Sequence, residues 1–252
     1  MKKTGLFLLA LLLLIRGGLL LPARASAEEA WTGEWYAVAV RLRESIYPAE
    51  HIDASSSLIF GEDGSVQWLI RGMHWKGSWQ ETPEKDGRTV SFPGLELRAE
   101  LEAKGVLALS MEEMTLLYIR ERTGILPPFR PTEAEGMRSF AGKWKLAYYE
   151  IENDYVSAKD PEYDMAGGLV IEDGQASFLL RIADSVCPQY DAPVSFSEGR
   201  LSWGPADYDS LEIRESVLTE SGYLFLPLRD RAEEIGLGTV LNLYFSRAEG
   251  NP

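Results

Sequence analysis

The feature that most constrains the fold of this chain is an internal repeat that covers nearly all of it. Gly-x-Trp occurs at Gly33–Trp35 and again at Gly142–Trp144. The segments that follow match in the same order, at offsets that drift only from 108 to 126 residues, for example LELR at 95–98 and LEIR at 211–214. Because chance similarities would not stay collinear over half a chain, we interpret the sequence as a tandem duplication of one unit.

Each unit contains about eight short candidates for β-strands. In the first unit these are 34–43, 56–61, 65–71, 74–81, 88–92, 95–102, 105–111 and 114–122. Apolar and polar residues alternate along several of them, with Val66, Trp68 and Ile70 on one face. This period of two is typical of half-buried antiparallel strands, and the Asp-Gly pairs at 63–64 and 173–174 suit tight hairpin turns. We therefore predict an all-β fold of antiparallel meanders.

Helical signal is sparse in both units. We expect one short helical turn in the first long loop of each, within 47–56 and 155–167, and a short helix near 229–236. The segment at 123–138 carries three prolines and is typical of a linker. The predicted division is a signal peptide (1–27), a first domain (28–122), a linker (123–138) and a second domain (139–248).

The N-terminus has the three parts of a secretory signal peptide. Lys2 and Lys3 precede the apolar run Leu6–Ile15, and Ala25-Ser26-Ala27 forms a small-x-small cleavage site. A membrane span needs about 20 apolar residues, and Arg16 interrupts the run well before that length. We therefore expect cleavage after Ala27, a secreted or extracytoplasmic location, and no membrane span in the mature protein.

Removal of the signal peptide makes the chain more acidic. It takes away four of 25 basic residues and none of 39 acidic ones, which leaves 25 − 4 = 21 basic residues and a net charge of 21 − 39 = −18. Such a charge argues against nucleic acid and anionic membrane surfaces as partners. Cys187 is the only cysteine, so no intrachain disulfide can form and packed cores must supply the stability.

A meander of eight strands opened by Gly-x-Trp resembles the lipocalin family, and more closely the small lipocalin-like domains found in tandem in secreted bacterial proteins. The matching residues are Gly33, Trp35, Gly142, Trp144 and Arg247. The resemblance implies that the tryptophan plugs the closed end of a barrel and that an arginine on the last strand packs over it. In the first unit, alignment on the last strand places Glu121 against Arg247, and Arg120 and Arg122 are each one residue out of register. Which arginine closes the first barrel therefore stays open.

The resemblance implies two tandem small eight-stranded antiparallel meander barrels. Each unit is about 95–110 residues long, far shorter than a full lipocalin, so the barrels are expected to be shallow. The family resemblance therefore implies more about the fold than about a ligand.

Aromatic residues are the main candidates for a ligand site. Five of the seven tryptophans belong to the first unit. The residues we predict to contact a ligand are Trp68, Trp75, Trp79, Phe178, Phe196 and Trp203. An eight-stranded barrel is just wide enough to be filled by side chains or to hold one small ligand. These aromatic side chains can therefore fill the cores, the commoner fate of inward tryptophan, or line an aromatic cup.

No residue pattern indicates catalysis or a resident metal. His51 and His74 lack a neighbouring nucleophile or metal-ligand spacing, and we interpret both as surface histidines. The acids at 160–164 begin like a calcium loop, but Met165 and Ile171 stand where that loop requires glycine and glutamate. We predict no catalytic residue, no metal ligand and no cofactor.

The sequence thus predicts a secreted, non-catalytic lipocalin-like protein that binds a small apolar or aromatic ligand in a barrel. The alternative is a structural or protein-interaction module of the cell exterior, with filled barrels, an extracellular protein partner and no small-molecule ligand. A void of about 300 Å³ or more would favour the first reading, and a solid core would favour the second.

Overall fold

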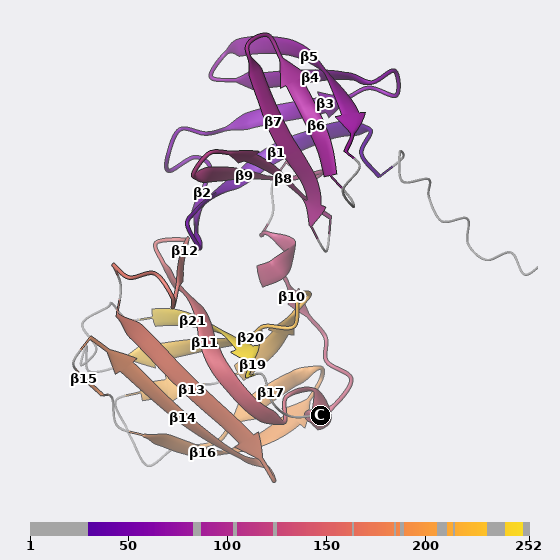
Figure 1. Ribbon diagram of the computed structural model, residues 1–252. Helices are drawn as coiled ribbons and strands as arrows, with labels where there is room; N and C mark the ends of the chain where they lie inside the picture. The colour runs from indigo at the N-terminus through magenta and orange to yellow at the C-terminus, as the bar shows by residue number, and fades with distance from the viewer. Residues whose placement is uncertain are drawn as a thin grey trace, which may run out of the picture.

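The computed structural model describes residues 30–82, 87–102, 105–122, 125–162, 164–183, 185–186, 189–205, 211–213, 215–230 and 240–248. Within these ranges the fold is all-β, as predicted, with two short 3-10 segments and no α-helix. Figure 1 shows the strands gathered in two groups, the first half of the chain in indigo to magenta and the second half in orange to yellow. No helix in the described ranges is long and apolar enough to cross a membrane.

The strands of the first half close an antiparallel barrel. They are β1 (Gly33–Leu42), β2 (Ser45–Pro48), β3 (Ser56–Phe60), β4 (Ser65–Ile70), β5 (Met73–Glu81), β6 (Gly87–Phe92), β7 (Leu95–Glu102), β8 (Val106–Met111) and β9 (Met114–Ile119). Successive strands from β3 to β9 pair with one another, and β1 pairs with both β3 and β9. The eight strands predicted for this half are confirmed, and β2 is an additional strand.

The strands of the second half follow a similar order. They are β10 (Pro131–Thr132), β11 (Gly142–Ile151), β12 (Asp154–Ser157), β13 (Met165–Glu172), β14 (Gln175–Ile182), β15 (Ser185–Val186), β16 (Tyr190–Ser197), β17 (Arg200–Trp203), β18 (Leu211–Ile213), β19 (Glu215–Thr219), β20 (Leu224–Asp230) and β21 (Val240–Arg247). β11 pairs with β13 and β21, and pairings join β13, β14, β16, β17, β19, β20 and β21 in turn.

The Asp-Gly turns form where the sequence predicts them, with different geometries. Asp173 and Gly174 both have positive φ, 50° and 75°, which is the two-residue turn that suits a twisted hairpin. In the first-half turn Gly64 has positive φ and Asp63 does not, and the Asp63 carboxylate accepts a hydrogen bond from the backbone N–H of Ser65 at 3.0 Å. A carboxylate that bonds to the backbone two residues on is a common way to fix such a turn.

The helical turns expected in the first long loops are wrong for the described residues. β2 and β12 occupy the start of these loops and form hairpins with β1 and β11. Isolated hydrogen-bonded turns follow, for example from His51 N–H to the Pro48 carbonyl at 3.0 Å. Strand pairing satisfies the backbone groups that a helical turn would otherwise have used. The helix expected near 229–236 begins inside β20, and its remaining residues lie outside the described ranges.

The segment predicted to be a linker is folded against the second half. It contains two 3-10 turns, η1 (Pro127–Phe129) and η2 (Met137–Ser139), with β10 between them. β10 pairs with β19, and the backbone N–H of Ala134 donates to the Gly199 carbonyl at 3.2 Å. Because these contacts fix its backbone, the segment from Pro127 onward is part of the second half.

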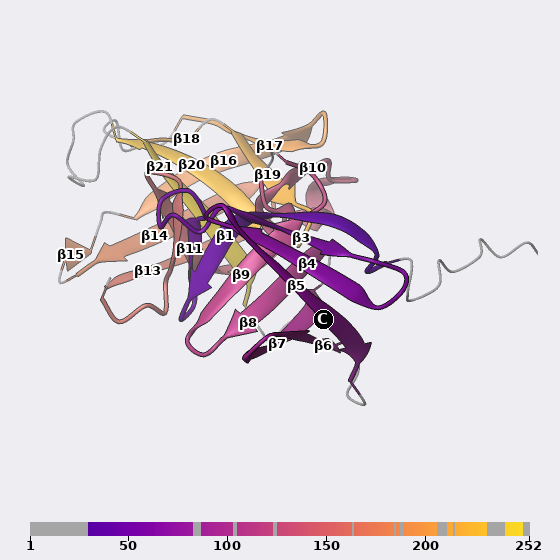
Figure 2. The ribbon, with the colours of Figure 1, turned by 90° about the horizontal axis from the view of Figure 1, so that it is seen from above.

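Three hydrophobic clusters pack among the described residues. One fills the first half and one fills the second. The third lies between the halves, where Phe129 stacks on Tyr155 with ring centroids 4.0 Å apart and packs edge-to-face on Tyr244 at 5.0 Å. β2 also pairs with β12 at Ile46 and Tyr155, and Figure 2 shows the strands of the first half lying over those of the second. The two halves therefore pack together through an aromatic interface.

Candidate functional site

In the second half, tryptophan and arginine meet at the start of β11 and the end of β21. Trp144 pairs with Arg247 across these strands, and the guanidinium carbon lies 4.4 Å from the indole centroid. The two terminal nitrogens of Arg247 donate to the carbonyls of Ala141, at 2.8 Å, and Ser139, at 2.6 Å. The Trp144 indole N–H donates to the Phe140 carbonyl at 2.8 Å. The arginine thus covers the indole and connects the last strand, β21, to the segment just before β11.

The first half has the same arrangement, and Arg120 is its arginine. The guanidinium carbon of Arg120 lies 4.3 Å from the Trp35 indole centroid, and its terminal nitrogen donates to the Ala30 carbonyl at 2.8 Å. Arg122 instead lies over Tyr36, at 5.0 Å. The alignment that places Glu121 opposite Arg247 is therefore wrong by one residue.

Glycine is required beside each of these arginines. Gly33 has a φ of 107°, and a Cβ there would lie 2.9 Å from Nη1 of Arg120. Gly142 has a φ of 114°, and its Cβ would lie 3.3 Å from Nη1 of Arg247. The Gly-x-Trp motif therefore combines a backbone that only glycine adopts easily with the space that the guanidinium needs.

The three tryptophans predicted as ligand contacts in the first half lie at different depths. Trp68 is buried, and its indole N–H donates to the hydroxyl of Tyr118 at 3.0 Å. Burial raises the pKa of that hydroxyl, so it stays a neutral partner. Trp79 is buried near the Trp35 end, where its N–H donates to the Gly61 carbonyl at 3.1 Å. Trp75 is half-buried at the opposite end and packs edge-to-face on Phe92.

A buried arginine accompanies Trp79. The side chain of Arg88 is 6% exposed and donates to the Glu81 carboxylate at 2.6 Å. Its guanidinium lies 5.1 Å from the Trp31 centroid and 5.5 Å from the Trp79 centroid, between the two rings. The Nε atom of Arg88 has no hydrogen-bond partner. Trp79 thus packs against a buried, carboxylate-paired arginine near the Trp35 end of the barrel.

The three aromatic candidates of the second half are also separated. Phe178 is buried in the core and packs on Phe245, with centroids 6.0 Å apart. Phe196 is half-buried and lies near Phe140, at 6.2 Å. Trp203 is buried, and its indole N–H donates to Ser216 Oγ at 2.9 Å. The six predicted residues therefore do not form one site. Four of them are buried in the two cores, and Trp75 and Phe196 are half-buried against those cores.

An apolar rim lies at the end of the first barrel away from Trp35. The pairing registers place the turns β4–β5, β6–β7 and β8–β9 at this end, which we call the mouth. Six half-buried apolar residues at the mouth pack on the core beneath them: Ile52, Ile70, Trp75, Leu95, Met111 and Met114. The mouth is therefore an apolar surface that rests on a core filled with aromatic side chains.

A hollow of about 480 Å³ opens on one side of this rim. We call it the mouth pocket; its lining residues are Leu95, Glu96, Leu97, Ser110, Met111, Glu112, Glu113 and Met114. The register explains its position, because β7 pairs with β8 only from Arg98 to Glu102. Leu95–Leu97 therefore lie beyond this pairing, beside the β8–β9 turn.

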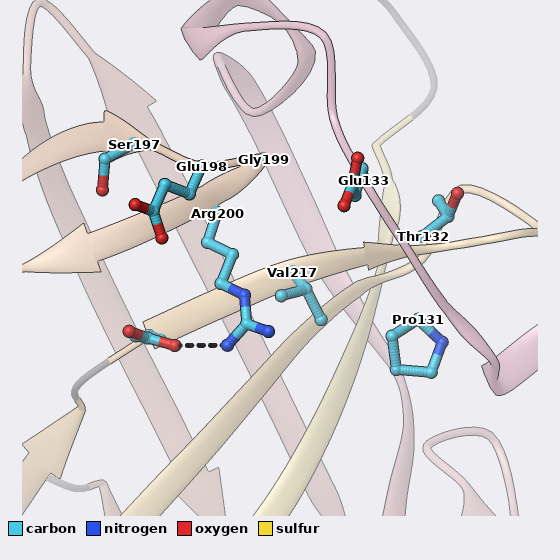
Figure 3. A pocket seen from close by; sticks show the side chains of 9 residues that line it. Pro131, Thr132, Glu133, Ser197, Glu198, Gly199, Arg200 and Val217 are labelled. Atoms are coloured by element: carbon cyan, nitrogen blue, oxygen red, sulfur yellow. Dashed lines mark hydrogen bonds and ion pairs between the residues drawn. The ribbon is translucent and has the colours of Figure 1, made fainter.

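A second hollow of about 560 Å³ lies in the second half and is mostly polar. Figure 3 shows it between the β16–β17 turn, with Glu198 and Arg200, and the segment around Glu133. Arg200 donates to the Glu215 carboxylate at 2.8 Å. Two charged residues of this hollow are therefore paired with each other, and of its described lining residues only Pro131, Val217 and Gly199 are apolar.

The structure assigns local partners to the polar residues considered in the sequence. His51 lies 2.9 Å from Asp154, and His74 lies 2.8 Å from Gln67. The Asp160 carboxylate accepts hydrogen bonds from Glu162 N–H and Ser45 Oγ, which lower its pKa. Within the described ranges no three His, Cys, Asp or Glu side chains could hold a metal ion together. Cys187 lies outside these ranges.

Comparison with known proteins adds little. No family model matches the chain, and no curated protein matches it. A solved structure from Nostoc punctiforme, a protein of unknown function from the DUF3598 family, aligns over 87% of this chain and 96% of its own. The identity is 10% and the TM-score is 0.26, so this likeness carries no argument about function.

Proposed function

We propose that this protein is a secreted, non-catalytic binding protein built from two tandem lipocalin-like barrels. The order of strand pairings around β1–β9 recurs around β11–β21, which supports the tandem barrels. The tryptophan–arginine contact at one end of each half supports the lipocalin-like character. The signal-peptide pattern at 1–27 and the acidic mature chain support a place outside the cytoplasm.

The ligand in this proposal is a small apolar molecule that lies across the mouth of the first barrel. The observation that carries the proposal is the mouth pocket, whose volume of about 480 Å³ falls within the usual range for small-molecule sites. Leu95, Met111 and Met114 supply flexible apolar surface, and Trp68 and Phe92 lie in the core below, 5.6 Å apart. Because aromatic side chains occupy the core, the site is shallow.

Titration with the neutral fluorescent probe 1-N-phenylnaphthylamine tests this proposal. We expect saturable binding at one site, weakened at least about tenfold in the double variant Met111→Gln/Met114→Gln, because each polar group reduces the burial of apolar surface. Met137→Gln is the matched control, since Met137 is half-buried against the core of the second half. Equal binding by the mouth variant and the wild type would place the site elsewhere.

A structural or protein-interaction module is the second candidate function. The filled cores favour it, since Trp35, Trp68, Trp144 and Trp203 all have their indole donors satisfied inside the protein. In that case a correctly folded protein would bind no apolar probe at the mouth, and the contact surface would lie on the outer faces or loops.

A further inference from the structure

The mouth pocket combines an apolar lining with a rim of one charge sign. Leu95, Leu97 and Met111 contribute apolar surface, and Glu96 and Glu112 are exposed carboxylates on the same hollow. Glu113 adds a third carboxylate, and none of the described residues that line the pocket is basic. An entering ligand therefore meets apolar side chains and negative charge together.

The nearby arginines are already paired with other carboxylates. Arg43 donates to Glu162 at 3.0 Å, and this bond is the main cause that raises the pKa of Arg43, with Glu113 a smaller contribution. Arg71, in the β4–β5 turn, forms an ion pair with Asp53 at 3.2 Å. Arg98, which pairs with pocket residue Ser110 across β7 and β8, forms an ion pair with Glu100 at 2.6 Å. Within the described residues, these ion pairs of the three arginines therefore go to carboxylates outside the pocket lining.

From this combination we infer that the mouth pocket selects cationic amphiphiles, which are small molecules with an apolar tail and an ammonium-type head. The inference rests on the proposed ligand site at the same mouth and names its ligand class. The tail would lie on the leucine and methionine side chains, since methionine adapts to varied apolar shapes. The head would lie by Glu96, Glu112 and Glu113, where carboxylates attract a cation and repel an anion.

Competition among three head groups on one tail tests the inference. The competitors are dodecyltrimethylammonium, dodecyl sulfate and dodecyldimethylamine oxide, which is uncharged above neutral pH. Each competitor is added below its micelle concentration and at low ionic strength, and its displacement of 1-N-phenylnaphthylamine is measured. We expect the cation to bind about tenfold more tightly than the neutral amphiphile, with the anion weakest, and the differences to shrink in about 1 M salt, where charges are screened within about 3 Å.

Two matched triple variants separate rim charge from total charge. Glu96→Gln/Glu112→Gln/Glu113→Gln neutralises the rim, and Glu62→Gln/Glu152→Gln/Glu198→Gln neutralises three exposed glutamates in other hairpin turns. We expect the first variant to lose the preference for the cation while its affinity for the neutral probe stays unchanged. The second variant should keep the preference.

Equal binding of the three head groups by the wild type would overturn the inference while leaving the apolar site intact. Loss of the preference in both triple variants would also overturn it, because net charge and not the rim would then be responsible. Failure of all three amphiphiles and of the neutral probe to bind would instead refute the proposed function itself.

Discussion

Arg247→Lys isolates what the arginine does at the closed end of the second half. Lysine keeps the positive charge but replaces the planar, five-donor guanidinium with a single ammonium group. Arg247 donates from separate nitrogens to the carbonyls of Ser139 and Ala141 while its plane lies over Trp144. A lysine cannot keep both bonds and cover the ring at once.

The expected cost is about 1–2 kcal/mol. Loss of one hydrogen bond costs about 0.5–1.5 kcal/mol, and the weaker contact with the indole costs about 0.5 kcal/mol more. Arg247 is exposed, which favours the lower part of this range. In a double-mutant cycle with Trp144→Leu, we expect a coupling energy of about 0.5 kcal/mol, because either substitution alone weakens the ring contact and the double variant loses it only once.

The assay is equilibrium urea unfolding of residues 28–252, followed by tryptophan fluorescence and circular dichroism. Arg138→Lys, at an exposed arginine of η2, is the control and should change the free energy of unfolding by less than about 0.5 kcal/mol. If Arg247→Lys costs no more than Arg138→Lys, or if the coupling with Trp144 is zero, the arginine does not clamp this end.

Three further predictions concern the first clamp and the interface between the halves. Gly33→Ala should cost about 1–3 kcal/mol in urea unfolding. It should cost more than Gly94→Ala, because Gly94 also has positive φ but a Cβ there would meet open space. Equal costs would show that the Arg120 side chain moves aside at no cost in stability. Phe129→Ala should cost about 3–5 kcal/mol and divide calorimetric unfolding into two transitions. Ile125→Ala is the control and should leave a single transition. An unchanged single transition in Phe129→Ala would contradict the role of the interface. Burial raises the pKa of both Tyr148 and Tyr155 to about 12, above the unfolded value of about 10. Their contribution to stability is therefore complete below pH 10 and is lost as pH rises toward 12. Urea midpoints that stay constant from pH 10 to pH 12 would refute this pH dependence.

Much of the fold could be predicted because strand alternation and the repeat are local or collinear signals. The eight strands of the first half follow from runs of alternating residues, and the Asp-Gly turns mark two hairpins. β2 and β12 were missed because they are short and lie in polar loops, and only pairing with β1 and β11 makes them strands. Their role is tertiary, since Ile46 meets Tyr155 across the two halves.

The choice between Arg120 and Arg122 in the first half stayed open in the sequence for a different reason. A shift in the pairing of β1 with β9 lies between Ala37 and Ala39, and β11 and β21 have the same irregularity between Leu146 and Tyr148. Tyr36 pairs with Ile119, so the next position along places Arg120 beside Trp35. Residue spacing alone does not reveal this register, because aligning the ends of the last strands does not account for how each strand pairs.

The mouth pocket could not be predicted from the aromatic residues on which the ligand hypothesis was built. Those residues are large enough to fill a small barrel, and the structure places most of them in the cores. Leu95, Met111 and Met114 gave no signal beyond ordinary strand alternation. A methionine on each side of the Glu-Glu turn at 112–113 was the available hint, and it gains meaning only when the strands place these side chains on one rim.

The most direct test of the binding proposal is methyl-resolved NMR of residues 28–252 labelled at the methionine methyl groups. Without Met1 the chain has five methionines: Met73, Met111, Met114, Met137 and Met165. On titration with 1-N-phenylnaphthylamine, we predict saturable shifts of the Met111 and Met114 signals, assigned by single substitutions, with Met137 and Met165 unmoved. Shifts confined to Met137 and Met165, or no shift at probe concentrations that saturate the fluorescence, would contradict a ligand site at the mouth of the first barrel.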